Sequence, residues 1–324
     1  MTPSETYLTK IRSLVETVAA QQSAIHQAAD WFAQTILAGR MVHLFGSGHS
    51  RIMVEEMWPR YGSFPGFNPI VELSLSFHNL VVGANGQRQA MFLENVSGLA
   101  ERILRNYDLS TAESALIISS SGCNVVPIEM AEEFKRRGVR VVALVSLAHA
   151  RASTSRRADG KKLTDFADLI LDTGAPVGDA MVMIDGLDTP VAPGSTVGGC
   201  LLVNAIKAEV AARLTAAGQP PKVLSAGVVV GAARATELFE AAYDEHAHRL
   251  ASTPPSAPAD FSDSLALSPS RSLFPRHALP PPAHLGDRQL PVSELARVRQ
   301  PPSRGVRPRR HRRASGRRSH RRGA

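Results

Sequence analysis

Apolar side chains recur three and four residues apart near the start of the chain. They stand at Leu8, Ile11, Val15, Val18, Ile25, Ala29, Phe32 and Ile36. This spacing predicts one long helix, which Gly39 ends. Because the apolar stripe is narrow and long, it resembles a heptad seam, and we expect it to contact another subunit. The alternative is an amphipathic helix that lies on its own domain.

After this helix, short apolar runs alternate with helical patterns, as an α/β fold requires. The runs that predict strands are at 41–45, 69–73, 114–118, 139–145 and 168–171. The patterns that predict helices cover 51–57, 88–106, 125–137, 197–217 and 235–250. The strands are apolar without alternation, which is typical of strands covered on both faces. We therefore expect an α/β fold with a doubly wound, five-stranded parallel sheet flanked by helices, whose ligands lie at the carboxyl ends of the strands.

Twice a predicted strand runs directly into a loop of glycine and serine and then into a helix. The first loop is Gly46-Ser47-Gly48-His49-Ser50, and the second is Ser119-Ser120-Ser121-Gly122-Cys123-Asn124. Such a junction aims unpaired backbone N–H groups and the positive end of the helix dipole at one point. The serine hydroxyls add donors that carry no charge. Two such loops in one parallel sheet predict a pocket for a phosphate and a small polyol.

Five further polar residues are candidates for binding or chemistry. His49 could hydrogen-bond a sugar oxygen or move a proton, and the alternative is a polar surface residue. Glu55 and Glu56 lie in the helix after the first loop, where burial would raise the pKa of a carboxylate towards the range of a general base. The alternative for both is a solvated helix face. Ser195 and Thr196 open a later helix, either as its N-cap or as phosphate ligands.

Charge divides the chain at Leu250. The whole chain has 37 basic and 29 acidic residues and a net charge of +8, but 15 of the basic and 4 of the acidic residues follow Leu250. The body therefore has a net charge of −3 and the tail one of +11. The tail is rich in arginine and proline, so we expect it to be disordered and to be the only part that would bind nucleic acid. The predicted segments are an N-terminal helical segment at 1–39, a phosphosugar-binding domain at 40–217, a helical extension at 218–250 and the tail at 251–324.

Cysteine content and hydropathy exclude several other classes of protein. Two cysteines cannot form a disulfide framework, and no Cys/His spacing of a zinc site is present. The first residues do not have the basic and apolar regions of a signal peptide. No apolar run approaches the length of a membrane span. We therefore expect a cytoplasmic protein with no metal and no membrane contact.

With these loops and this order of strands and helices, residues 29–217 resemble the sugar isomerase (SIS) domain family. Residues 1–250 are most similar to the UPF0309 branch of that family, in the stretches at 160–163, 174–180 and 195–197. The resemblance implies that the protein binds a phosphorylated sugar or amino sugar as a homodimer or homotetramer. It also implies that no metal, nucleotide or other cofactor takes part.

The resemblance also assigns roles to particular residues. In phosphoheptose isomerases the serines of the second loop hold the phosphate, which maps onto Ser119 and Ser121, and Asn124 replaces a third serine. In N-acetylmuramic acid 6-phosphate etherases a glutamate at the end of the helix after the first loop is the catalytic base. It maps onto Glu56 in the stretch Glu56-Met57-Trp58-Pro59-Arg60-Tyr61-Gly62, with Glu55 in reserve. A second acid of those etherases maps onto Glu94.

Two classes of function follow from the sequence. The first is an enzyme, either an aldose–ketose phosphosugar isomerase or an etherase-like lyase, and both abstract a proton next to a carbonyl. The second is a non-catalytic phosphosugar-binding module, because SIS domains also serve as sensors in regulators. The presence of Glu55 and Glu56 favours the enzyme.

Overall fold

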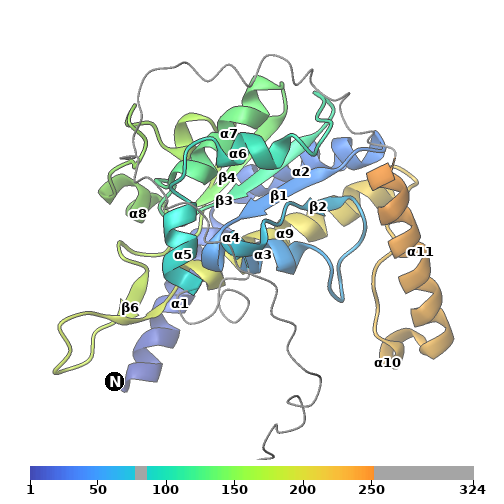
Figure 1. The fold of residues 1–324 in the computed structure, drawn as a ribbon. Coiled ribbons are helices and arrows are strands. Elements are labelled where there is room, and N and C mark those ends of the chain that lie inside the picture. The colour runs from blue at the N-terminus through green and yellow to red at the C-terminus, as the bar shows by residue number, and fades with distance from the viewer. Residues whose placement is uncertain (77–85, 252–324) are drawn as a thin grey trace, which may run out of the picture. The chain divides into compact units, whose positions relative to one another are not determined.

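A five-stranded parallel sheet lies at the centre of the fold, with strand order β2-β1-β3-β4-β5 (Figure 1). The computed structural model describes residues 1–76 and 86–251, so the predicted tail, apart from Ala251, lies outside the described residues. The strands are β1 (Val42–Gly46), β2 (Phe67–Pro69), β3 (Ser114–Ile118), β4 (Arg140–Val145) and β5 (Leu169–Asp172). The predicted doubly wound parallel sheet is confirmed.

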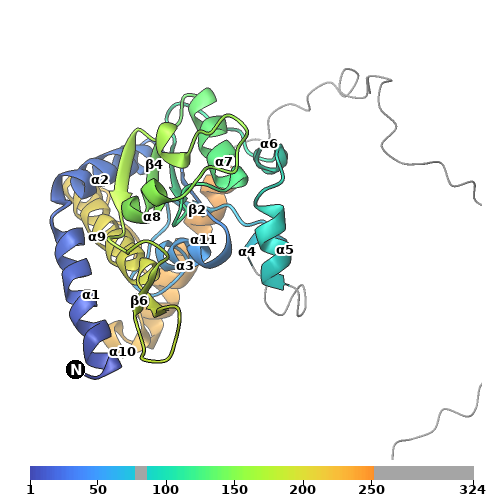
Figure 2. The same cartoon turned by 90° about the vertical axis from the view of Figure 1, so that its left-hand side faces the viewer.

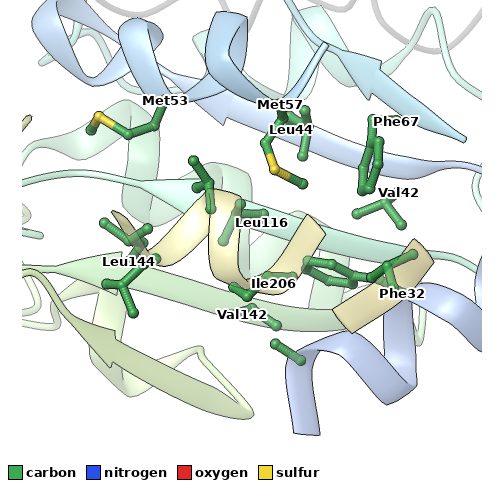
Figure 3. Close-up of a cluster of buried hydrophobic side chains, with 14 of the residues drawn as sticks. Phe32, Val42, Leu44, Met53, Met57, Phe67, Leu116, Val142, Leu144 and Ile206 are labelled. Atoms are coloured by element: carbon green, nitrogen blue, oxygen red, sulfur yellow. The ribbon is translucent and has the colours of Figure 1, made fainter. Parts of the chain in front are cut away.

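Helices cover both faces of this sheet. On one face lie α2 (Gln22–Leu37), α3 (Arg51–Met57) and α9 (Ser195–Ala216), and on the other lie α6 (Leu99–Leu104) and α7 (Val125–Arg136). Successive strand residues point to opposite faces, so Leu116 packs in the first core and Ile117 in the second. Figure 3 shows the first core, where Phe32 of α2 and Ile206 of α9 meet the side chains of the sheet. Both faces are thus buried, which explains why the strands are apolar without alternation.

The remaining elements surround this three-layered centre. They are α1 (Pro3–Ala19), a 3-10 turn η1 (Gly48–Ser50), α4 (Leu73–Ser76), α5 (Gly86–Leu93), α8 (Leu147–Ala152), a second turn η3 (Leu163–Asp165), the antiparallel strands β6 (Ala180–Val182) and β7 (Val191–Pro193), α10 (Gly227–Val230) and α11 (Ala232–Ala251). Figure 2 shows α1 beside α9, and Leu14 of α1 is buried in the first core. The sequence patterns did not predict α8, the β6–β7 pair or α10.

The single long N-terminal helix predicted from the sequence is divided into α1 and α2. At the break, the side chain of Gln21 accepts a hydrogen bond from the backbone N–H of Asp172 and donates one to its carbonyl oxygen, both at 2.8 Å. The amide thereby caps the open edge of β5. Most of the predicted stripe is buried in its own domain, while Leu8 and Val15 remain exposed. The helical segment thus packs on its own domain over most of the stripe, and the contact with another subunit stays a prediction.

The helix predicted at 88–106 is also divided, into α5 and α6. Gly98 stands between them with a φ of 83°, a left-handed conformation that glycine adopts at little cost. Glu94 lies just after α5, and its carbonyl oxygen accepts a hydrogen bond of 2.9 Å from the N–H of Val126 in α7. The break thus fixes Glu94 beside the beginning of α7.

The order of the strands brings the two glycine and serine loops together. The chain moves from β1 outwards to β2 and then returns to the other side of β1 as β3, so the topology switches direction between β1 and β3. These two strands pair in parallel, with Gly46 opposite Ile118. The loops that follow them therefore leave the same edge of the sheet side by side, where α/β proteins bind ligands.

The close packing of α9 against the end of β5 gives a test of this fold. A methyl group on Gly198 would lie 2.0 Å from the backbone oxygen of Thr173, whereas one on Gly199 would meet only the flexible side chain of Met53, at 2.9 Å and beyond. We expect Gly198→Ala to lower the free energy of unfolding by about 1–3 kcal/mol. Gly199→Ala, the matched control, should change it by less than about 1 kcal/mol, because the gain in helix propensity offsets a small shift of Met53. Urea denaturation measures both, and equal stability of the two variants would contradict the packing.

Candidate functional site

A cavity of about 640 Å³ lies at the carboxyl ends of the parallel strands. Eleven of the residues singled out in the sequence line it: Ser47, Gly48, His49, Ser50, Glu94, Ser119, Ser120, Ser121, Asn124, Ser195 and Thr196. Gly46, Glu55 and Glu56 do not line it. No lysine or arginine is among the described residues that line this cavity, so an anion there would be bound chiefly by uncharged donors.

The first loop begins with a tight turn that requires glycine. A side chain on Gly46 would lie 2.7 Å from the backbone oxygen of Ser50, so only hydrogen fits there. The turn is closed by the N–H of Ser50, which donates to the carbonyl oxygen of Ser47 at 3.1 Å. The Ser47 hydroxyl donates in turn to Glu94 Oε2 at 2.8 Å. Gly46 thus shapes the loop without lining the cavity, and Ser47 holds the carboxylate of Glu94.

The second loop presents three serine hydroxyls. Ser119 Oγ accepts from the N–H of Gly122 at 3.2 Å, and Ser121 Oγ accepts from the N–H of Cys123 at 3.3 Å. A hydroxyl that accepts a hydrogen bond can still donate its own proton. Ser120 Oγ is buried, and within the described part of the chain it has no hydrogen-bond partner. All three hydroxyls can therefore donate to a ligand.

Helix α7 starts directly after this loop and is twelve residues long. Asn124 is its N-cap residue, but no side chain accepts a hydrogen bond from the first backbone N–H groups in the described part of the chain. The N–H of Val126 donates to the carbonyl oxygen of Glu94, and Pro127 has no N–H, so among the first three helical residues the N–H of Val125 remains for a ligand. A backbone N–H at the start of a helix can bind an anion. The start of α7 and the serine hydroxyls lie in one continuous stretch of chain.

Glu94 is a half-buried carboxylate in the wall of the same cavity. Burial raises the pKa of Glu94, and hydrogen bonds from Ser47 and Asn124, with the positive charge of Arg156, offset part of that rise. A raised pKa makes the carboxylate a stronger base, which favours its accepting a proton from a substrate. Three glutamates and one histidine were assigned to catalysis from the sequence, and of these four residues Glu94 and His49 line the cavity.

Glu55 and Glu56 line a different hollow, which lies between α3, the turn at 59–61 and α11. Glu56 accepts hydrogen bonds from Asn204 Nδ2 at 2.7 Å and from Arg60. Burial raises the pKa of Glu56, but these hydrogen bonds and the charges of Arg60 and Lys207 outweigh it, so its pKa lies below the ordinary 4.5. The structure differs here from the expectation of a carboxylate with a raised pKa beside the sugar pocket.

The cause is the short length of α3. It has seven residues and turns Glu56 towards Asn204 of α9. Trp58, two residues after Glu56 in the same stretch, is buried in the first core.

Two titratable residues that line the cavity, Asp179 and His149, were not among the site residues predicted from the sequence. Asp179 accepts hydrogen bonds from the N–H and the hydroxyl of Ser195, at 2.7 and 2.8 Å, and from the N–H of Gly194 at 3.1 Å. The start of α9 is thereby capped, so Ser195 is an N-terminal residue held by a carboxylate rather than an open phosphate donor. The stretch at 174–180, singled out for its resemblance, contains Asp179 and was the available signal.

His149 stands in α8 on the next loop along the sheet. Its Nδ1 accepts a hydrogen bond from the N–H of Gly178 at 2.9 Å. In the neutral imidazole the proton then resides on Nε2, which makes this ring nitrogen a donor. No motif marked His149 in the sequence, because α8 itself was not predicted.

Two searches of the described residues bear on other classes of site. No group of three or more His, Cys, Asp or Glu side chains in residues 1–76 and 86–251 is arranged to hold a metal ion. None of the helices in those ranges is long and apolar enough to cross a membrane.

The chain is similar to a known domain family, to curated proteins and to solved structures. The model of the SIS domain matches residues 6–146. A UPF0309 protein of Halalkalibacterium halodurans is 34% identical over 221 residues, which cover 68% of this chain and 89% of that protein. A UPF0309 protein of Thermoanaerobacter pseudethanolicus is 34% identical over 231 residues, covering 70% and 91%. A phosphoheptose isomerase structure from Neisseria gonorrhoeae is 15% identical with a TM-score of 0.41, covering 64% of this chain and 95% of that one.

The environment of Glu94 predicts a pH dependence of stability. Its pKa is higher in the folded chain than the ordinary 4.5, so the folded state favours the protonated form. The free energy of unfolding of the parent, relative to Glu94→Gln, should be greatest below pH 4.5 and should fall as the pH rises through the raised pKa. Urea denaturation at a series of pH values measures this difference.

Glu56→Gln is the matched control, because the pKa of Glu56 is lowered and its stabilising effect is present above pH 4.5 and lost below it. Between pH 4.5 and 8 the difference between the parent and Glu56→Gln should therefore rise to a plateau and should not fall. A difference for Glu94→Gln that does not fall over the same range would contradict the environment described for Glu94.

Proposed function

This chain belongs to the UPF0309 family of SIS-domain proteins, and from that premise we propose that its cavity binds a phosphorylated sugar or amino sugar. The observation that carries the proposal is the buried, unpartnered hydroxyl of Ser120 in the loop before α7. An unpartnered buried hydroxyl is unfavourable, and a phosphate oxygen would accept its proton. The family membership agrees with the resemblance inferred from the two loops.

The phosphate lies against the second loop in this proposal. Ser119, Ser120 and Ser121 donate hydroxyl protons, and the N-terminus of α7 contributes the N–H of Val125 and the positive end of its dipole. At the start of α9, Asp179 already accepts the N–H and hydroxyl protons of Ser195.

The sugar extends from the phosphate towards the first loop and Glu94. A volume of about 640 Å³ falls within the range of small-molecule sites. Gly48, Ser50, Thr196 and the imidazole of His149 also line the cavity. These groups can exchange hydrogen bonds with hydroxyls, while the two carboxylates of the cavity make it poorly suited to a second phosphate.

The reaction that we propose is a proton transfer at a carbon next to a carbonyl, as in a phosphosugar isomerase or an etherase-like lyase. Glu94 is the proposed base, because it lines the cavity, is held by Ser47 at 2.8 Å and has a raised pKa. His49, at the other side of the first loop, is the second candidate for moving a proton. Glu55 and Glu56 lie in the separate hollow and take no part in this proposal.

Binding is tested by thermal unfolding with a panel of sugar phosphates and their unphosphorylated parents. A phosphosugar at 100 times its Kd should stabilise the parent protein by about 2.7 kcal/mol, and the unphosphorylated sugar should not. Ser120→Ala should weaken binding by about 1.5–3 kcal/mol, the range for hydrogen bonds to charged groups. Ser13→Ala, on the exposed side of α1, is the control and should bind as the parent does. No shift with any phosphosugar, or equal affinities of Ser120→Ala and the parent, would refute this placement of the phosphate.

Chemistry is tested separately on a phosphosugar that binds. Glu94→Gln keeps the shape and the hydrogen-bonding reach of the side chain, so its affinity should stay close to that of the parent. Its turnover should fall by roughly 10²–10⁴, the usual contribution of a general acid–base group. Glu56→Gln should turn over at the parent rate because it lies outside the cavity. If Glu56→Gln turned over slowly while Glu94→Gln kept full activity, the catalytic base would be Glu56. If the parent protein bound the phosphosugar without turning it over, the non-catalytic sensor function would be favoured.

A further inference from the structure

The last two helices leave apolar side chains in solvent. In α10 the side chains of Val228 and Val229 are 93% and 79% exposed. The following helix, α11, has twenty residues, of which Ala242 is the only fully buried one among those described. Figure 1 shows α11 with α10 at its lower end. Neighbouring exposed apolar residues of this kind mark sites of interaction in folded proteins, and we call Val228–Val230 the valine knob.

An apolar hollow lies on the same chain beside α11. It has a volume of about 510 Å³, and its apolar lining is Ile52, Pro59, Tyr61, Leu224, Phe239 and Tyr243. The rings of Tyr61 and Phe239 meet edge to face at 5.7 Å, so the aromatic wall is ordered. This hollow is separate from the cavity at the ends of the strands, with which it shares none of its lining residues.

We infer that the valine knob of one copy of the chain docks in the hollow of a second copy, and that the second copy returns the same contact. A chain that carries both a knob and a matching hollow can satisfy both at once in a two-fold dimer. The valines do not line the hollow of their own chain, so both surfaces of each copy remain for contact with the other copy.

Charges at the two surfaces agree with this arrangement. Glu55 stands at the hollow with its side chain 51% exposed, and Arg234 follows the knob with its side chain 54% exposed. Arg234 pairs with Glu237 on its own helix, and this exposed pair contributes little to stability; Glu55 pairs with Arg51, whose side chain is 22% exposed. Arg234 can therefore turn to its counterpart on the second copy at little cost.

The oligomeric state of the full chain tests this inference, measured by sedimentation and light scattering. The parent should have a mass that is an even multiple of 34.8 kDa. Val229→Asp, which alters the knob, and Tyr61→Ser, which alters the hollow, should each halve that mass, because either change removes one half of the contact. Val71→Asp is the matched control, since Val71 is 49% exposed and lies in neither surface. A monomeric parent, or an unchanged mass for both variants, would overturn the inference.

Cross-linking tests the pairing itself. Val229→Cys and Tyr61→Cys proteins are mixed in equal amounts and treated with a short bis-maleimide, with the parent as the control for Cys123 and Cys200. Peptide mass spectrometry should find residue 229 of one variant joined to residue 61 of the other. Cross-links that join other positions in the mixture, with none between 229 and 61, would overturn the proposed pairing.

Discussion

The parallel pairing of β1 with β3 is the constraint on which the candidate site depends. With Gly46 opposite Ile118, the two strands end level with each other, and the loops that follow them leave one edge of the sheet together. A shift of one residue in this register would turn every side chain of the strand to the other face and would move the serines away from the first loop. Both cores secure the register, because alternate residues of β3 are buried on each face of the sheet.

The electrostatics of the cavity follow from how two helices begin. The start of α7 has no capping side chain and is next to three serine hydroxyls, whereas Asp179 caps the start of α9 with three hydrogen bonds. Glu94 lies close to the start of α7, where Asn124 and Ser47 hold it and burial raises its pKa. In the proposed arrangement the phosphate lies against the second loop and the carbon skeleton extends towards the first loop and Glu94.

The sequence predicted the sheet and the two loops because both depend on local patterns. Apolar runs followed by Gly46 and by Ser119–Gly122 are visible without knowledge of distant contacts. The position of Glu56 could not be predicted in this way, because it depends on a hydrogen bond from Asn204, 148 residues away in the chain. The break at Gln21 depends likewise on the backbone of Asp172, and the role of Asp179 depends on Ser195. Local periodicity carries no record of such contacts.

A crystal structure of the protein with a bound sugar phosphate tests the central claim most directly, because it locates the phosphorus atom. The account predicts phosphate oxygens within hydrogen-bond distance of Ser120 Oγ and of the N–H of Val125 at the start of α7, with the sugar carbons towards Glu94. A phosphate at the start of α9, or in the hollow beside α11, would contradict it.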